Sequence, residues 1–128
     1  MVALPTPILF VENDSLVARS VERVLRRNGL RIQHIQSCRA ARKAVELLKA
    51  GDVAPFELGI FDVDLDDGNG VYLAAELLET GLVRRSVFFT ACTDESLKHR
   101  ANDLGMVISK SLGVGALVLT LRESVLAA

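Results

Sequence analysis

The sequence predicts an α/β fold in which a parallel β-sheet of five strands carries helices on both faces. Short apolar runs alternate with amphipathic helical segments along the whole chain, which is typical of consecutive βαβ units. Most of the apolar runs are continuous, as expected for strands that are buried on both faces. The chain has 128 residues, no internal repeat and no linker, so we expect a single domain over residues 1–128.

The first expected elements are a strand, a helix and an edge strand. Residues 7–11 are continuously apolar, and Asn13 or Asp14 can then cap a helix. That helix is expected to end at 28–29, because glycine is favoured just past a helix end. The stretch 30–36 alternates in polarity, which predicts a strand at the edge of the sheet.

The middle of the chain repeats this pattern around an acidic loop. A second helix is expected to begin at Ser37 or Cys38 and to end at 51–52. A third strand, 58–61, leads into the acidic loop. A third helix then follows at 71–78.

The last part of the chain adds two more strand and helix pairs. The strand 86–90 precedes a short polar helix, 95–103, which Asp94 can cap. The strand 106–109 precedes a final helix, 114–126. Five strands at this spacing suit a flavodoxin-like doubly wound sheet with strand order 2-1-3-4-5, whose ligands bind beyond the carboxyl ends of the strands.

The composition argues against several classes of function. The formal net charge is −1 and Tyr72 is the sole Trp or Tyr residue, so direct binding of nucleic acid is not expected. No apolar stretch approaches the roughly 20 residues of a membrane-spanning helix, and we expect a cytoplasmic protein. Cys38 and Cys92 lack the spacing of a metal site and are expected to be free thiols.

Polar residues gather where the predicted strands end. Glu12 and Asn13 follow the first strand, Asp62 the third and Lys110 the fifth, and Thr90 closes the fourth. A parallel sheet places these ends at one edge, where carboxylates repel one another unless a cation lies between them. Mg²⁺ suits one or two carboxylates and bridges to phosphate oxygens, which a lysine and a hydroxyl can also bind. We therefore expect Asp62 to act as a nucleophile toward a phosphoryl group.

This arrangement resembles the receiver domain of two-component response regulators over essentially the whole chain. The residues that carry the resemblance are Asp62, the loop 66–70, Thr90–Ala91 and Lys110. The resemblance implies a phosphoacceptor and not an ordinary enzyme: Asp62 would accept a phosphoryl group from a histidine kinase or a phosphotransfer protein and so switch a partner or an output domain. Thr90 and Lys110 would contact the phosphoryl group, and the small Ala91 would leave access to it.

The resemblance also implies a Mg²⁺ site. Its ligands would be Glu12, Asn13, Asp62 and the backbone carbonyl of Asp64. The family usually has a second acid where Asn13 stands, and the neutral amide predicts weaker binding of Mg²⁺. The side chain of Asp64 is expected close to the phosphoryl group, either as a modulator of hydrolysis or as a solvated loop acid.

Further positions depart from the family pattern. Ser111 stands where the family usually has proline, often through a cis bond, and we expect a trans bond because a cis bond before serine costs about 3 kcal/mol. Val107 stands where an aromatic ring commonly swings with Thr90, so that route of output is not expected. Asp66 and Asp67 are expected to be solvated loop acids, with Asp66 at a position where the family often has proline.

Two other functions remain open from the sequence. The departures at Asn13, Val107 and Ser111 favour a receiver-like interaction module that works without phosphorylation. The segment 62–64 also resembles the nucleophile motif of haloacid-dehalogenase-type phosphatases. That motif normally lies on the first strand, however, and no acidic metal motif follows Lys110 in this chain.

The last two helices are expected to offer a surface for a partner. In the final helix, Leu117 and Leu121 share the apolar face that would meet the core. Leu119 and Leu126 fall roughly 100–140° away from that face. This second strip predicts a homodimer or a contact with an output domain through the last two helices.

Overall fold

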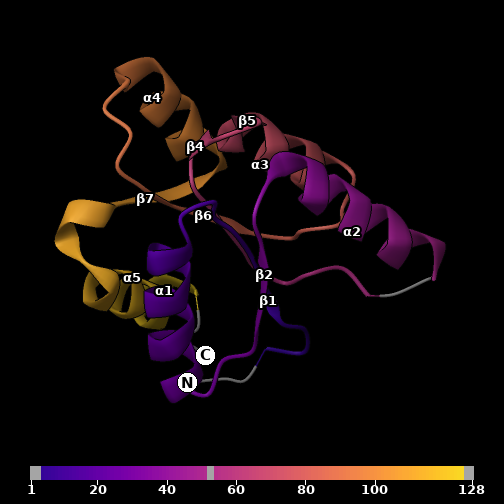
Figure 1. The fold of residues 1–128 in the computed structure, drawn as a ribbon, viewed down its shortest axis with the longest axis horizontal. Coiled ribbons are helices and arrows are strands. Elements are labelled where there is room, and N and C mark those ends of the chain that lie inside the picture. The colour runs from indigo at the N-terminus through magenta and orange to yellow at the C-terminus, as the bar shows by residue number, and fades with distance from the viewer. Residues whose placement is uncertain (1–3, 52–53, 126–128) are drawn as a thin grey trace.

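The computed structural model describes residues 4–51 and 54–125, and it confirms the predicted doubly wound α/β fold (Figure 1). The five strands of the central sheet are β1 (Ile8–Val11), β2 (Ile32–Ile35), β3 (Gly59–Phe61), β6 (Ser86–Thr90) and β7 (Gly105–Ser109). All neighbouring pairs are parallel, in the order β2-β1-β3-β6-β7. Counted along the chain within this sheet, this is the predicted order 2-1-3-4-5.

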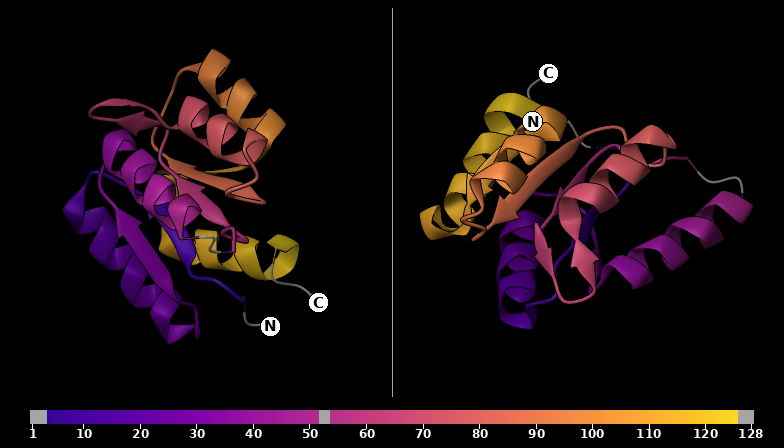
Figure 2. Two further views of the ribbon diagram at one scale, coloured as in Figure 1. Left: turned by 90° about the vertical axis from the view of Figure 1, so that its right-hand side faces the viewer. Right: turned by 90° about the horizontal axis from the view of Figure 1, so that it is seen from above.

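Helices cover both faces of the sheet (Figure 2). They are α1 (Ser15–Arg27), α2 (Cys38–Ala50), α3 (Gly70–Glu79), α4 (Glu95–Leu104) and α5 (Val114–Thr120). Helices α1 and α5 lie on one face, whereas α2, α3 and α4 lie on the other. Because the strands connect through these helices, their carboxyl ends all point to one edge of the sheet.

The sheet separates two apolar cores. Successive residues of β1 alternate between them, since side chains along a strand point to opposite faces. Ile8 and Phe10 pack in the core under α1 and α5, and Leu9 and Val11 pack in the core under α2, α3 and α4. All four side chains are fully buried, which explains why the β1 sequence is continuously apolar.

Side chains at the expected positions cap the helices. The carboxylate of Asp14 accepts hydrogen bonds from the backbone N–H groups at the start of α1, and Asp94 does the same for α4. The hydroxyl of Ser37 accepts from the backbone of α2. The amide oxygen of Asn69 caps α3, which the sequence had not singled out.

The acidic stretch after β3 contains a short hairpin that was predicted only as a loop. Strands β4 (Asp64–Leu65) and β5 (Gly68–Asn69) pair antiparallel. Two acidic residues form the turn between them, in place of the Asn-Gly or Asp-Gly pair that usually marks a tight hairpin. Strands of two residues carry almost no periodic signal, so the sequence pattern did not reveal this hairpin.

Asp67 is exposed, as expected of a solvated loop acid, but it also has a capping role that the sequence did not reveal. Its carboxylate lies at the surface but accepts the backbone N–H groups of Cys38 and Arg39 at 2.9 Å each. These are donors at the start of α2, which otherwise lack a partner within the helix. The bonds lower the pKa of the Asp67 carboxyl, with the N–H of Arg39 as the largest cause and that of Cys38 next. The hairpin is therefore fastened to α2.

The final helix differs from the expected span 114–126. Helix α5 ends at Thr120, and a π-helical turn, η2 (Leu121–Val125), follows it. Leu117 and Leu121 are buried and Leu119 is exposed, as the pattern predicted, while Leu126 lies outside the described residues. Across residues 4–51 and 54–125, no helix has the length and apolarity that crossing a membrane requires.

Candidate functional site

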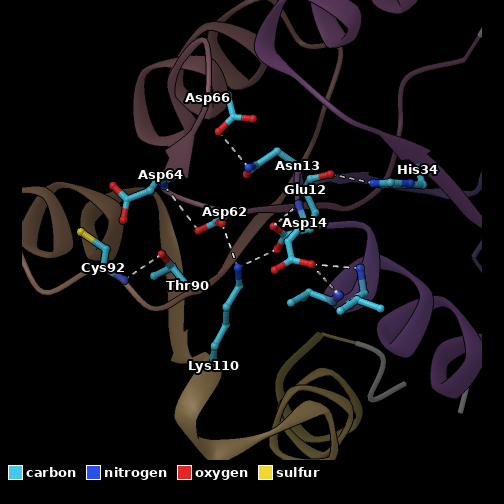
Figure 3. Close-up of polar contacts among 12 residues, drawn as sticks. Glu12, Asn13, Asp14, His34, Asp62, Asp64, Asp66, Thr90, Cys92 and Lys110 are labelled. Carbon is cyan, nitrogen blue, oxygen red and sulfur yellow. Dashed lines mark hydrogen bonds and ion pairs between the residues drawn. The ribbon is translucent and has the colours of Figure 1, made fainter.

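The carboxyl edge of the sheet brings three of the predicted site residues into direct contact (Figure 3). Glu12 follows β1, Asp62 follows β3, and Lys110 begins the 3-10 turn η1 (Lys110–Leu112) that follows β7. The ammonium nitrogen of Lys110 lies 2.8 Å from Glu12 Oε1 and 2.9 Å from Asp62 Oδ2. One cation therefore bridges two carboxylates that come from different strands.

These charges are held in a largely dry environment. Glu12 is fully buried and Asp62 is 5% exposed, which is unusual for acidic side chains. Burial is the main cause that raises the pKa of Glu12; the bond to Lys110 acts against it, and the nearby charge of Asp62 raises that pKa further. For Lys110, burial acts to lower the pKa, but the bonds to Glu12 and Asp62 outweigh it and raise the pKa.

Asp62 owes part of its position to Gly70. The backbone N–H of Gly70, the first residue of α3, donates to the carbonyl of Val63 at 2.8 Å. A Cβ atom on Gly70 would lie 1.7 Å from the carbonyl oxygen of Asp62. Only glycine permits this approach of the helix start to the backbone at Asp62. Sequence reasoning assigned no role to this glycine, although it stands directly before an apolar helix.

The other predicted metal ligands, Asn13 and Asp64, lie on opposite sides of Asp62 (Figure 3). The Asn13 side chain donates from Nδ2 to Asp66 Oδ1 at 3.1 Å. The backbone N–H of Asp64 lies 3.4 Å from Asp62 Oδ1, and the Asp64 side chain is exposed. Asp66 was expected to be a solvated loop acid. It is exposed, but its carboxylate also accepts this hydrogen bond from Asn13, which follows β1.

As metal ligands, the oxygen atoms of these residues fit Mg²⁺ in kind and number. The described ranges contain no group of three or more Asp, Glu, His or Cys side chains that is placed to hold a metal ion. Mg²⁺, however, is bound by one or two carboxylates together with waters, and Glu12 and Asp62 supply two. Glu12 Oε1 is fully buried and has no hydrogen-bond donor of regular geometry among the described residues, although the Lys110 ammonium compensates its charge.

Thr90 lies at the end of β6, beside Asp62 (Figure 3). Its buried Oγ1 accepts the backbone N–H of Cys92 at 3.1 Å, so the hydroxyl hydrogen can still be donated. The neighbouring Ala91 is exposed. Thr90 and Val107 also line a cavity of about 300 Å³ between α4 and β7. This cavity lies where a larger side chain at Val107 would have room.

The turn after β7 delivers Lys110 to the site without a cis bond. The Lys110–Ser111 peptide is trans, as expected from the cost of a cis bond before serine. Ser109 caps η1 by accepting the backbone N–H of Ser111 at 3.2 Å. The replacement of the family's proline by Ser111 therefore does not keep Lys110 from reaching both carboxylates.

The two cysteines belong to the apolar core under α2, α3 and α4. Cys38 and Cys92 are free thiols, as expected, and both are buried. Burial is the main cause that raises the pKa of the Cys38 thiol, and the negative charge of Asp67 adds to it. A buried thiol of raised pKa is a poor nucleophile, so Cys38 is a packing residue.

Comparison with known proteins identifies a consistent set of relatives. The family described as "Response regulator receiver domain" matches residues 8–122 of the chain. No match was found among functionally curated proteins.

Several solved structures share the fold. A CheY-like response regulator receiver domain protein from Methanospirillum hungatei JF-1 aligns with a TM-score of 0.75 and 19% identity, over 92% of this chain and 91% of that one. The signal receiver domain of a putative LuxO repressor from Vibrio parahaemolyticus aligns with a TM-score of 0.73 and 16% identity, over 95% and 89%. That of an HD domain-containing protein from Pseudomonas fluorescens Pf-5 aligns with a TM-score of 0.73 and 21% identity, over 92% and 93%. At these identities the likeness supports the fold.

Proposed function

Because the chain belongs to the family of response regulator receiver domains, we propose that Asp62 accepts a phosphoryl group from a histidine kinase or a histidine phosphotransfer protein. The observation that carries this proposal is the contact of the buried Asp62 with Lys110 at 2.9 Å, at the carboxyl edge of the sheet. An ionised carboxylate that faces a fixed cation in a largely water-excluded site is suited to attack phosphorus and to stabilise the charge that develops there.

The proposed step transfers one phosphoryl group between two side chains. A carboxylate oxygen of Asp62 forms a bond to phosphorus as the bond from phosphorus to the donor's imidazole nitrogen breaks, and that nitrogen then takes up a proton. Lys110 pairs with a phosphoryl oxygen, and the hydroxyl of Thr90 donates to another. Ala91, small and exposed, leaves the approach to Asp62 open.

We further propose that Mg²⁺ supports this transfer. Glu12, Asn13, Asp62 and the backbone carbonyl of Asp64 would hold the ion. When bound, it would neutralise charge on the phosphoryl oxygens. Glu12 and Asp62 supply two charged oxygens and Asn13 a neutral one, so binding is expected to be weaker than at a site with three carboxylates. Lys110 competes with the ion for Glu12 and Asp62.

Phosphorylation is proposed to alter binding to a partner in the cytoplasm. The partner classes are the kinase or phosphotransfer protein that supplies the phosphoryl group, and a second copy of the chain or an output domain that reads it. The surface of α4, β7 and α5 is the proposed site of read-out, because Met106 and Leu119 are exposed apolar side chains there.

The test of phosphoryl acceptance is a mass measurement. The protein is incubated with acetyl phosphate and Mg²⁺, and its intact mass is followed over time. We expect the mass increase of one phosphoryl group, and its loss in Asp62→Ala and on removal of Mg²⁺. An adduct of the same yield in Asp62→Ala would refute the assignment of the acceptor. Release of free phosphate from unrelated monoesters would indicate a phosphatase.

A second candidate function is an interaction module that works without phosphorylation. The bridge from Lys110 to both Glu12 and Asp62 favours it, because these contacts compensate the buried carboxylates without a metal ion. This function predicts no adduct in the acetyl phosphate experiment above, and none when a panel of phosphorylated histidine phosphotransfer proteins is used as donors instead. An adduct that depends on Asp62 would argue against it.

A further inference from the structure

We propose that Asp66 is a positioning residue, which holds the amide of Asn13 so that its oxygen, and not its NH₂ group, is available to a divalent cation. This inference rests on the proposed metal-dependent function and adds a residue to it. Asp66 was expected to be a solvated acid, and its partner is the one side-chain ligand of the proposed site that lacks a carboxylate.

The contact joins two segments that are far apart in the sequence. Asn13 follows β1, and Asp66 lies in the turn of the β4–β5 hairpin, 53 residues later. Figure 3 shows the two side chains pointing toward each other above Asp62. The carboxylate of Asp66 can only accept hydrogen bonds when ionised, so the 3.1 Å contact requires that the NH₂ group of Asn13 faces it. The amide oxygen must then face away from Asp66.

The hairpin presents Asp66 from a fastened turn. The next residue, Asp67, accepts two backbone N–H groups at the start of α2 at 2.9 Å each. Leu65 and Gly68 pair across the hairpin, and Gly70 bonds back to Val63 at 2.8 Å. An anchored turn loses little conformational freedom when its carboxylate binds Asn13, so the bond can orient the amide effectively.

The orientation matters only for an amide. An asparagine side chain has one face that binds cations and one that repels them, and these two faces exchange by rotation about the bond to the amide carbon. A carboxylate has two equivalent oxygens and needs no such control. Residues that orient metal ligands through a hydrogen bond typically change the affinity for the metal by about 10-fold to 100-fold. Asp66 should therefore matter when Asn occupies position 13 and not when Asp does.

The test compares two replacements of Asp66 that remove the same charge. Asp66→Asn keeps an oxygen that can accept from Asn13, and Asp66→Ala removes it. Each is made with Asn13 and with Asn13→Asp, alongside both parents. Binding of Mn²⁺ is followed by the electron paramagnetic resonance signal of the free ion, with Mg²⁺ as competitor. Thermal unfolding by circular dichroism confirms that each variant is folded at the titration temperature.

With Asn13 present, we expect Asp66→Ala to bind about 10-fold more weakly than Asp66→Asn. With Asn13→Asp, the two should agree within about twofold, because no amide remains to be oriented. We also expect Asn13→Asp alone to bind more tightly than the parent, as its added charge predicts.

Two results would overturn the inference, and they can be told apart. If the parents bind the ion but the ratio between Asp66→Ala and Asp66→Asn is the same in both backgrounds, Asp66 does not orient Asn13 and the proposed function stands. If no variant binds Mn²⁺ or Mg²⁺, the metal-dependent function fails and the inference fails with it.

Discussion

The ammonium of Lys110 contacts two carboxylates, those of Glu12 and Asp62, and Glu12 is the more deeply buried of the two. Glu12 is fully buried, and both burial and the charge of Asp62 raise its pKa above the usual value of 4.5. Its ionised form at neutral pH therefore costs folding free energy, which Lys110 only partly offsets.

Neutralising Asp62 should for this reason stabilise the fold. Asp62→Asn keeps an acceptor for Lys110 and removes the repulsion of Glu12, so we expect a gain of about 1 kcal/mol in the free energy of unfolding at neutral pH. The raised pKa of Glu12 means that it takes up a proton as the pH falls, and the gain should then shrink toward pH 4.5, its ordinary pKa. Urea unfolding of both proteins across this range measures the difference. A gain that does not change with pH would show that Glu12 is not its source.

At the scale of elements, the β4–β5 hairpin connects the segment after β3 to α2. Asp67 binds the first N–H groups of α2, and Asn69 caps α3 from the other end of the hairpin. The same short segment thus fixes the starts of two helices, in addition to carrying Asp66. The attachment of this hairpin to α2 should therefore be most stable while Asp67 is charged.

Loss of this charge should destabilise the protein in a pH-dependent manner. Bonds to Arg39 and Cys38 lower the pKa of Asp67 below its usual 3.8, so its contribution is present above that value and is lost as the pH falls through the lower folded value. We expect Asp67→Ala to unfold at lower urea concentration than the wild type at neutral pH, with the two curves converging in acid. Asp67→Asn, which can still cap, should lose less. Equal midpoints for wild type and Asp67→Ala at neutral pH would contradict the role of this contact.

Most of the fold could be predicted from the sequence, but fewer of the contacts around the candidate site could be. The strand order followed from continuous apolar runs such as that around Phe10, and caps such as Asp14 were legible because they stand directly before a helical pattern. The partners of Asp66 and Asp67 were not legible, since both bonds join residues that are distant in sequence. The need for glycine at position 70 depends on the path of another segment of backbone, which no local pattern records.

At the scale of the whole molecule, the exposed apolar side chains fall on separate surfaces. Leu119 of α5 is 56% exposed and lies on the surface proposed for read-out, whereas Leu47 of α2 is 68% exposed and lies over the opposite core. Single exposed leucines are common on protein surfaces, so exposure alone does not establish a contact at Leu119. The proposed contact is tested by placing a charge at this position and measuring association.

We expect Leu119→Glu to weaken self-association of the phosphorylated protein about 10-fold or more, because a carboxylate would be buried at the contact. Leu47→Glu makes the same change at a similarly exposed leucine and should leave association unchanged. Sedimentation equilibrium of the three proteins measures this. Unchanged association in Leu119→Glu would remove the last helix from the interface.

The buried side chains on the two faces of the sheet form two separate clusters. The strand ends beside Asp62 lead to elements on both of these faces. Two connections lead away from these strand ends. Thr90 leads through Cys92 toward α4 on one face, and Lys110 leads through η1 into α5 on the other. A phosphoryl group that draws on both residues would therefore address both faces of the molecule simultaneously.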